Sequence, residues 1–139
     1  MKTLFSQKAG KDFEKLLALI GDIDWTLQHS HNLIVKPKRN EEYIGFMIHI
    51  GKSDTLFFGV WSEFWKKTGS PFILVFSGDE KFEFITHEIF KKYFVKNKNI
   101  FCDYILYEGC NCLSFGYEFI KNSKVEDVTR KIIEVSKLT

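Results

Sequence analysis

Two histidines and three cysteines are the residues whose spacing could support chemistry. His29 and His31 stand two positions apart, so on a strand both imidazoles would project from one face and could bind zinc or another transition metal. Cys110 and Cys112 share this spacing, and a hairpin would place Cys102 opposite them. The spacing fixes no third and fourth ligand, and buried cysteines commonly act as small hydrophobic side chains. We therefore predict neither a metal nor a cofactor.

Catalysis by a thiol or by paired carboxylates is not favoured. A cysteine nucleophile needs an imidazole within hydrogen-bond reach, and only the fold could bring His49 or His87 to a cysteine. Three acidic residues, Asp79, Glu80 and Glu83, follow an apolar segment, but the Glu-x-Lys of a metal-dependent nuclease centre is absent. Helix capping and a solvated surface explain these acids, and the balance favours a non-catalytic protein.

Short groups of basic residues could instead bind nucleic acid. Phosphate binding needs several cations on one surface, and exposed aromatic rings beside them could stack on single-stranded bases. The candidate residues are Lys36, Lys38, Arg39, Lys66 and Lys67. Only two arginines are available for bidentate recognition, and the formal net charge is only +2. Dispersed solubilising charge is the simpler explanation, and nucleic-acid binding is the alternative hypothesis.

The composition predicts one domain spanning residues 1–139. This length suits a single hydrophobic core, and 15 phenylalanines bring the aromatic share to 17%. Surplus aromatic residues on an exposed face would mark a contact surface. No apolar segment has the length of a secretory signal or of a membrane span, and the odd cysteine count suits a reducing compartment. We expect a cytoplasmic protein that does not enter a membrane.

The N-terminal third predicts a helix followed by strands. Apolar residues from Ala9 to Ile20 recur at helical spacing behind Ser6, a possible cap, and Gly21 stands where a helix usually ends. Alternation around Trp25 and Leu27, and again around Leu33 and Val35, predicts one or two short strands that end at Pro37.

The central segment predicts a hairpin, a short helix and a buried strand. Residues 43–50 and 55–61 alternate on either side of the turn sequence GKSD, which indicates an antiparallel pair. A short helix over 62–68 would end at Gly69, and Trp61, Phe64 and Trp65 would project to one side of it. The apolar run 72–76 predicts a central strand.

The C-terminal half predicts a helix, a second hairpin and a final helix. Residues 82–94 have a helical stripe, although the segment KFEFIT could form a strand. Segments 101–107 and 110–119 flank a two-residue loop, and Ser123 with Glu126 gives the spacing of a capping box. These elements predict an α+β fold: five to six strands in one mainly antiparallel sheet, with three to four helices on one face.

Aromatic, glycine and proline residues recur across positions 43–76: Tyr43, Gly45 and Phe46, then Phe58, Gly59, Val60 and Trp61, then Trp65, Gly69, Pro71 and Phe72. With these residues, the segment resembles an accessory region of bacterial proteins in the PD-(D/E)XK nuclease superfamily. It covers about a quarter of the chain, Phe72 replaces the usual leucine, and the nuclease motif does not accompany it. The resemblance implies a stand-alone relative of a non-catalytic region, from a bacterium or a mobile element.

These observations favour a non-catalytic binding protein over an enzyme. We expect a protein partner, as for an immunity or defence-related factor that occludes its target. Exposed tryptophans are common contact hot spots, and acidic residues near them could complement a basic partner. The expected contact residues are Trp61, Trp65, Asp79, Glu80 and Glu83.

Overall fold

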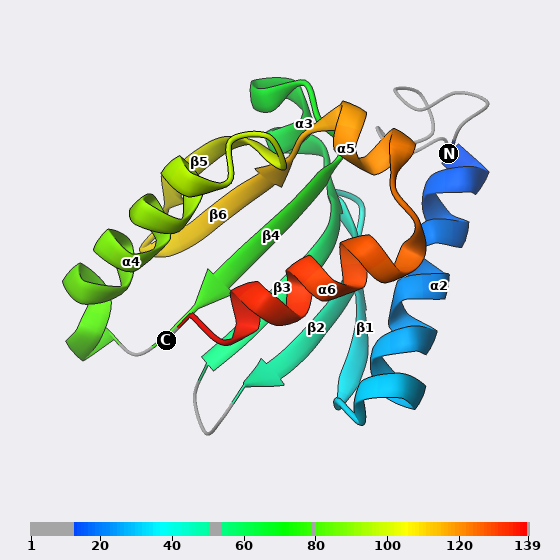
Figure 1. Cartoon of the computed structure of the whole chain (residues 1–139), viewed down its shortest axis with the longest axis horizontal. Coiled ribbons are helices and arrows are strands. Elements are labelled where there is room, and N and C mark those ends of the chain that lie inside the picture. Colours follow the sequence, from blue (N-terminus) through cyan, green and yellow to red (C-terminus); the bar gives the residue numbers. More distant parts are fainter. Residues whose placement is uncertain (1–12, 51–53, 79, 139) are drawn as a thin grey trace.

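The computed structural model describes residues 13–50, 54–78 and 80–138, and its six strands form one antiparallel sheet (Figure 1). The sheet order is β1-β2-β3-β4-β6-β5. The strands are β1 (Val35–Arg39), β2 (Tyr43–Ile50), β3 (Asp54–Trp61), β4 (Phe72–Ser77), β5 (Phe101–Tyr107) and β6 (Cys110–Phe115). The helices are α2 (Phe13–His31), α3 (Ser62–Thr68), α4 (Glu83–Lys96), α5 (Tyr117–Asn122) and α6 (Val125–Ser136), with the short 3-10 helix η2 (Glu80–Phe82) before α4. The predicted α+β single-sheet fold is confirmed.

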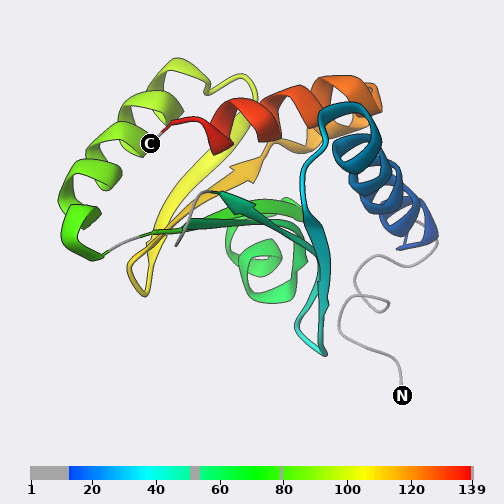
Figure 2. The same ribbon diagram turned by 90° about the horizontal axis from the view of Figure 1, so that it is seen from below.

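The helices lie on both faces of the sheet rather than on one. Helices α2, α4 and α6 cover the face that we call the helical face, and α3 lies on the opposite side, the α3 face (Figure 2). Alternating strand residues separate the two: Phe58 and Leu74 belong to the core of the helical face, whereas Phe57 and Val75 face α3. The expectation of a one-sided sheet was wrong because α3 buries its own side chain, Phe64, in a second apolar cluster.

The first hairpin and the central strand confirm the alternation of the sequence. Strands β2 and β3 pair from Tyr43 opposite Trp61 to Ile50 opposite Asp54, while turn residues 51–53 lie outside the described part. Strand β4 lies between β3 and β6 and is buried on both faces from Phe72 to Phe76, as its continuous apolar sequence predicts.

The second hairpin turns at Glu108 and Gly109, as predicted. Both residues have positive φ, 48° and 80°, which is the conformation of a two-residue primed turn. Strand β6 ends at Phe115, however, and does not continue to residue 119. Gly116 precedes an additional helix there, α5, whose partly buried Phe119 stacks on Phe115.

Helix α2 corrects the expected N-terminal elements. It passes through Gly21, where the sequence predicts an end, because a glycine within a helix costs only about 1 kcal/mol relative to alanine. Buried side chains on one side, including Ile20, Ile23 and Leu27, hold the longer helix against the core. The expected cap at Ser6 lies outside the described residues.

The strands predicted on either side of this segment change accordingly. Trp25 and Leu27 lie in α2 and form no strand. Strand β1 continues past Pro37 to Arg39, because β1 is an edge strand and tolerates a residue without an N–H donor.

The other helix boundaries agree within a few residues. Gly69 ends α3 with a φ of 76°, as predicted. Helix α4 forms where the helix rather than the strand was expected. The capping contact at the start of α6 lies one residue later than predicted. The Lys124 N–H donates to the Asp127 carboxylate at 3.0 Å, in place of a contact between Ser123 and Glu126.

Candidate binding site

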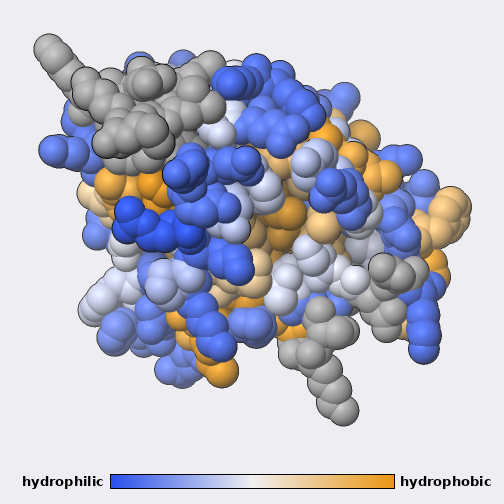
Figure 3. Space-filling model, turned by 180° about the vertical axis from the view of Figure 1, so that it is seen from behind, coloured by the Kyte–Doolittle hydropathy of each residue, from blue (hydrophilic) through white to orange (hydrophobic). Residues whose placement is uncertain are grey.

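An apolar groove lies on the α3 face, beside α3. It has a volume of about 190 Å³, and the side chains that form it are Lys38, Tyr43, Met47, Phe57, Trp61, Val75, Ser77, Tyr107, Glu108 and Cys110. The view from behind the molecule shows an apolar strip at the centre of this face with hydrophilic residues on either side (Figure 3). Helix α3 covers only part of the sheet here, so Tyr43 and Trp61 stay partly exposed.

A pair of glycines creates room for the aromatic floor of the groove. Gly45 and Gly59 are cross-strand partners, and the tip of the Phe57 ring lies within 2.9 Å of the point that a β-carbon would occupy at either position. This placement lets Phe57 contact Tyr43 and Trp61 edge-on, at centroid distances of 5.5 and 5.8 Å. Such edge-to-face pairs are a favoured aromatic geometry.

The two tryptophans expected to act together lie in different clusters. Trp61 is the last residue of β3, so the pleat of the strand directs it to the α3 face, where its ring meets Phe64 at 5.3 Å. Trp65 packs instead against the core of the helical face. The expectation that Trp61, Phe64 and Trp65 share one side is therefore wrong, and only Trp61 of the two tryptophans lines the groove.

Trp61 also has an unused hydrogen-bond donor. Its indole nitrogen, Nε1, is buried and has no acceptor among the described residues. A buried donor without an acceptor is uncommon in folded proteins and lowers the stability of the folded state by about 1–3 kcal/mol.

The wall of the groove opposite β1 is acidic. The Tyr107 hydroxyl lies 3.5 Å from the Glu63 carboxylate, to which it donates, and Glu108 precedes the turn glycine. The negative charges of Glu108 and Glu63 raise the pKa of Tyr107. Lys67 pairs with Glu63 at 3.4 Å and lies over the Tyr107 ring, so it compensates Glu63 locally.

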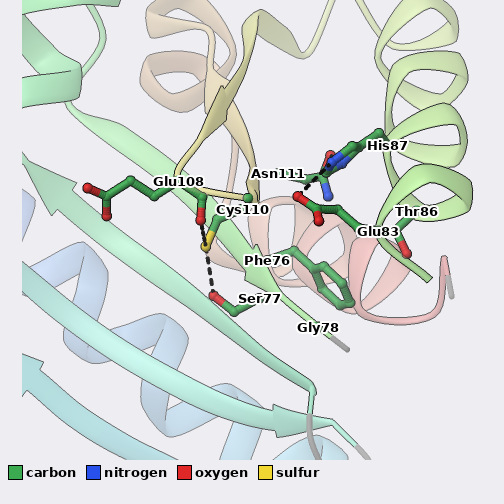
Figure 4. A pocket seen from close by; sticks show the side chains of 10 residues that line it. Phe76, Ser77, Gly78, Glu83, Thr86, His87, Glu108, Cys110 and Asn111 are labelled. Atoms are coloured by element: carbon green, nitrogen blue, oxygen red, sulfur yellow. Dashed lines mark hydrogen bonds and ion pairs between the residues drawn. The ribbon is translucent and has the colours of Figure 1, made fainter. Parts of the chain in front are cut away.

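A second, polar cavity adjoins the groove at the end of β4. It measures about 410 Å³ and shares Ser77, Glu108 and Cys110 with the groove. Figure 4 shows Ser77 and Cys110 on one side of the cavity, with His87 and Asn111 on the other. Ser77 Oγ and Cys110 Sγ lie 3.2 Å apart, within hydrogen-bond distance.

His87 is held by its neighbours on the helical face. Its Nε2 lies 3.3 Å from the Glu83 carboxylate and its Nδ1 lies 3.1 Å from the Asn111 side-chain oxygen. The same oxygen accepts a hydrogen bond from the Tyr104 hydroxyl. An amide oxygen only accepts, so the contact at Nδ1 is a hydrogen bond in the tautomer that carries its proton there.

The three cysteines are unpaired thiols in different environments. Cys102 is exposed and Cys110 is partly buried, whereas Cys112 is fully buried. Burial, followed by the neighbouring Cys110, raises the pKa of Cys112 to about 12, and burial also raises the pKa of Cys102. Raised values keep both thiols protonated at neutral pH, which opposes nucleophilic chemistry. The described part of the chain contains no cluster of three or more cysteine, histidine or acidic residues that could hold a metal ion.

The predicted geometry of the histidine pair was wrong. His29 and His31 lie in the last turn of α2, and residues two apart in a helix point in nearly opposite directions. His29 stacks on Trp25, and its Nδ1 lies 2.9 Å from the Trp25 carbonyl oxygen. The helix therefore removes the shared face on which a metal site would depend.

The five basic candidates do not share one surface. Lys36 and Lys38 project to the α3 face of β1, while Arg39 faces the opposite side because strand residues alternate. Lys66 and Lys67 follow on α3, and Lys67 is paired with Glu63. Only part of the predicted basic surface therefore borders the groove.

Of the three acidic candidates, the structure describes the side chain of Glu83. Glu83 borders the polar cavity beside His87. Glu80 lies in η2, and Asp79 is outside the described residues. The structure therefore places Glu83 at this site and does not test the expected positions of the other two side chains.

Sequence reasoning missed most of the groove, although signals for it exist. The alternation in β2 places Tyr43 and Met47 on one face, and two strands of this hairpin suffice to add Phe57 and Trp61 to that face. The i, i+4 spacing of Glu83 and His87 in a predicted helix could have indicated their contact.

No family model, curated protein or solved structure matches this chain. The likeness of residues 43–76 to a nuclease-associated region therefore rests on the quoted residues alone. Among the described helices, none combines the length and apolar character needed to cross a membrane.

Proposed function

We propose that this chain is a non-catalytic protein that binds a protein partner through the groove on its α3 face. The observation that carries the proposal is the aromatic floor beside α3, where Tyr43 and Trp61 stay partly exposed around the buried Phe57. Buried aromatic anchors surrounded by polar residues are typical of the energetically important centre of protein interfaces.

The side chains of the polar cavity agree with a non-catalytic protein better than with thiol catalysis. Cys110 is engaged with Ser77, whereas His87 is engaged with Glu83 and Asn111, on the other side of β6. A cysteine nucleophile needs an imidazole that faces it directly. The contacts of these side chains therefore favour a structural role at the end of the sheet.

Co-purification from the native host tests the proposal. Met47→Glu places a charge in the middle of the groove, and we expect a stoichiometric partner of the wild-type chain to be lost from this variant. Val95→Glu is the matched control, because Val95 is 62% exposed on α4, away from the groove. Lys38→Glu provides a second groove variant at an exposed position, should Met47→Glu unfold. A partner retained equally by both groove variants, or no stoichiometric partner at all, would contradict the proposal.

The resemblance of residues 43–76 favours a particular form of this function. We propose an immunity or defence-related factor of bacterial or mobile-element origin, which occludes a toxin or a nuclease in the cytoplasm. An adjacent toxin or nuclease gene would supply the candidate target. Purified chain should then inhibit that target at equimolar concentration, and full target activity in its presence would count against this form.

Nucleic-acid binding is the second candidate, because Lys38 lines the groove and Lys36 projects from the same face of β1. A labelled oligothymidine titrated at low salt should bind, with affinity falling steeply as salt rises. Replacing Lys36 and Lys38 by alanine should weaken binding, whereas the same changes at Lys91 and Lys92 on α4 should not. The acidic wall at Glu108 opposes a polyanion, so we rank this candidate below a protein partner.

A further inference from the structure

The groove has opposite charges at its two ends. Among the described residues that line it, the charged ones are Lys38 on edge strand β1 and Glu108 in the turn between β5 and β6. Strands β1 and β5 are the two edges of the sheet. Lys36 projects from the same face of β1 as Lys38 and reinforces the positive end. The charge that a bound segment meets therefore changes from positive at the Lys38 end to negative at the Glu108 end.

The middle of the groove is apolar and aromatic. Tyr43, Met47, Phe57 and Val75 come from β2, β3 and β4, three of the four strands between the two edges. Bulky side chains of a partner would lose water here, whereas charged ones would be desolvated without a counter-charge. Beside this apolar stretch, the buried indole N–H of Trp61 has no acceptor in the part of the chain that the structure describes.

The width of the sheet limits the length of the segment that fits. Neighbouring strands are about 4.8 Å apart, so the five gaps between β1 and β5 span roughly 24 Å. An extended chain advances about 3.3 Å per residue, so this distance across the strands corresponds to about seven residues. The side chains of Lys38 and Glu108 reach inward, so a shorter segment can contact both.

We propose that the occupant of the groove is an extended segment of the partner with a fixed charge polarity. Its acidic side chain contacts Lys38, its central bulky apolar side chains pack on Phe57 and Met47, and its basic side chain contacts Glu108. This inference rests on the proposed function, since it specifies the partner of the same groove. Charge complementarity of this kind determines orientation and selectivity more than total affinity.

A random heptapeptide library displayed on phage, selected against the immobilised full-length chain, tests the proposal. Enriched peptides should carry Asp or Glu toward one end and Lys or Arg toward the other, with bulky apolar residues between them. A synthetic consensus peptide is then titrated against the wild-type chain, Lys38→Glu, Glu108→Lys and the doubly exchanged variant. Lys92→Glu on α4 is the matched control for a single charge reversal.

Each single reversal at the groove should weaken the consensus peptide by about threefold to tenfold at low salt, and Lys92→Glu should leave it unchanged. The doubly exchanged variant should prefer a peptide whose acidic and basic residues have changed places. Folding of all variants is checked by thermal unfolding.

Three results would overturn the proposed charge polarity. These are enriched peptides that lack the expected order of charges, a selection that enriches no peptide, or a consensus peptide that binds both charge-reversed variants as tightly as the wild type. The proposed function is judged separately by co-purification. A native partner lost from Met47→Glu would keep that function valid even when the polarity fails.

Discussion

Gly45 and Gly59 face each other across the β2–β3 hairpin, and neither position has room for a side chain. A β-carbon on Gly45 or Gly59 would lie 2.7 Å from the Cα of the other, and within 2.9 Å of the Phe57 ring. Gly59→Ala should therefore lower the free energy of unfolding by about 2 kcal/mol or more, since the neighbouring backbone cannot move away. Denaturant unfolding measures this change. An unfolding midpoint equal to that of the wild type would show that the strands separate easily, contrary to the prediction.

Gly21→Ala is the opposite case and an internal control. Gly21 lies in the middle of α2, and no heavy atom lies within 4 Å of a β-carbon built there. Alanine should raise the free energy of unfolding by about 0.5–1 kcal/mol, because it has the better helix propensity and restricts the unfolded chain. The same denaturant measurement applies. Destabilisation by Gly21→Ala would mean that α2 is not continuous through this residue.

Local sequence patterns predict the elements whose boundaries depend on neighbouring residues. The alternation of Tyr43–Ile50, the Glu108-Gly109 turn and the stop at Gly69 all act within a few residues, and each is confirmed. The end of α2 depends on tertiary packing instead. Burial of Leu27 against the core outweighs the tendency of Gly21 to end the helix, and the residues around Gly21 do not indicate that contact.

The groove depends on long-range pairing, so only its central hairpin can be predicted from sequence. Tyr43 and Trp61 are cross-strand partners in a predictable hairpin. Lys38 and Glu108 reach the same groove only because β1 and β5 become the two edges of one sheet. Strand order is set by the packing of the whole domain, and no residue spacing encodes it locally.

The buried thiol should react far more slowly than the other two. Cys112 is fully buried and has its pKa raised to about 12, whereas Cys110 is partly exposed and Cys102 is exposed. Iodoacetamide at mildly alkaline pH should label Cys102 and Cys110 in the native protein and spare Cys112, and peptide mass spectrometry measures each site. In denaturant all three should react alike. Native labelling of Cys112 as fast as Cys110 would contradict the burial of β6.

Tyr104 should make stability sensitive to alkaline pH. Burial, followed by Cys112 and Glu88, raises the pKa of Tyr104 to about 12 from the usual 10.0. A raised folded-state pKa means that the stabilising contribution is complete below pH 10 and is lost as pH rises toward 12. Tyr104→Phe removes the hydrogen bond to Asn111, so its free energy of unfolding at neutral pH should be about 1 kcal/mol lower than that of the wild type. Between pH 10 and pH 12, the stability of this variant should fall less than that of the wild type. Parallel pH profiles for both proteins would contradict this prediction.

Partner binding should change the fluorescence of Trp61 specifically. Trp61 lines the groove, whereas Trp25 is 60% exposed on α2 and Trp65 packs in the helical-face core. A segment that covers the groove excludes water from the exposed part of the Trp61 ring, so the intrinsic emission should shift on titration with the consensus heptapeptide. Trp25→Phe should retain the shift, and Trp61→Phe should abolish it while both variants remain folded. A full shift in Trp61→Phe would place the binding surface elsewhere on the molecule.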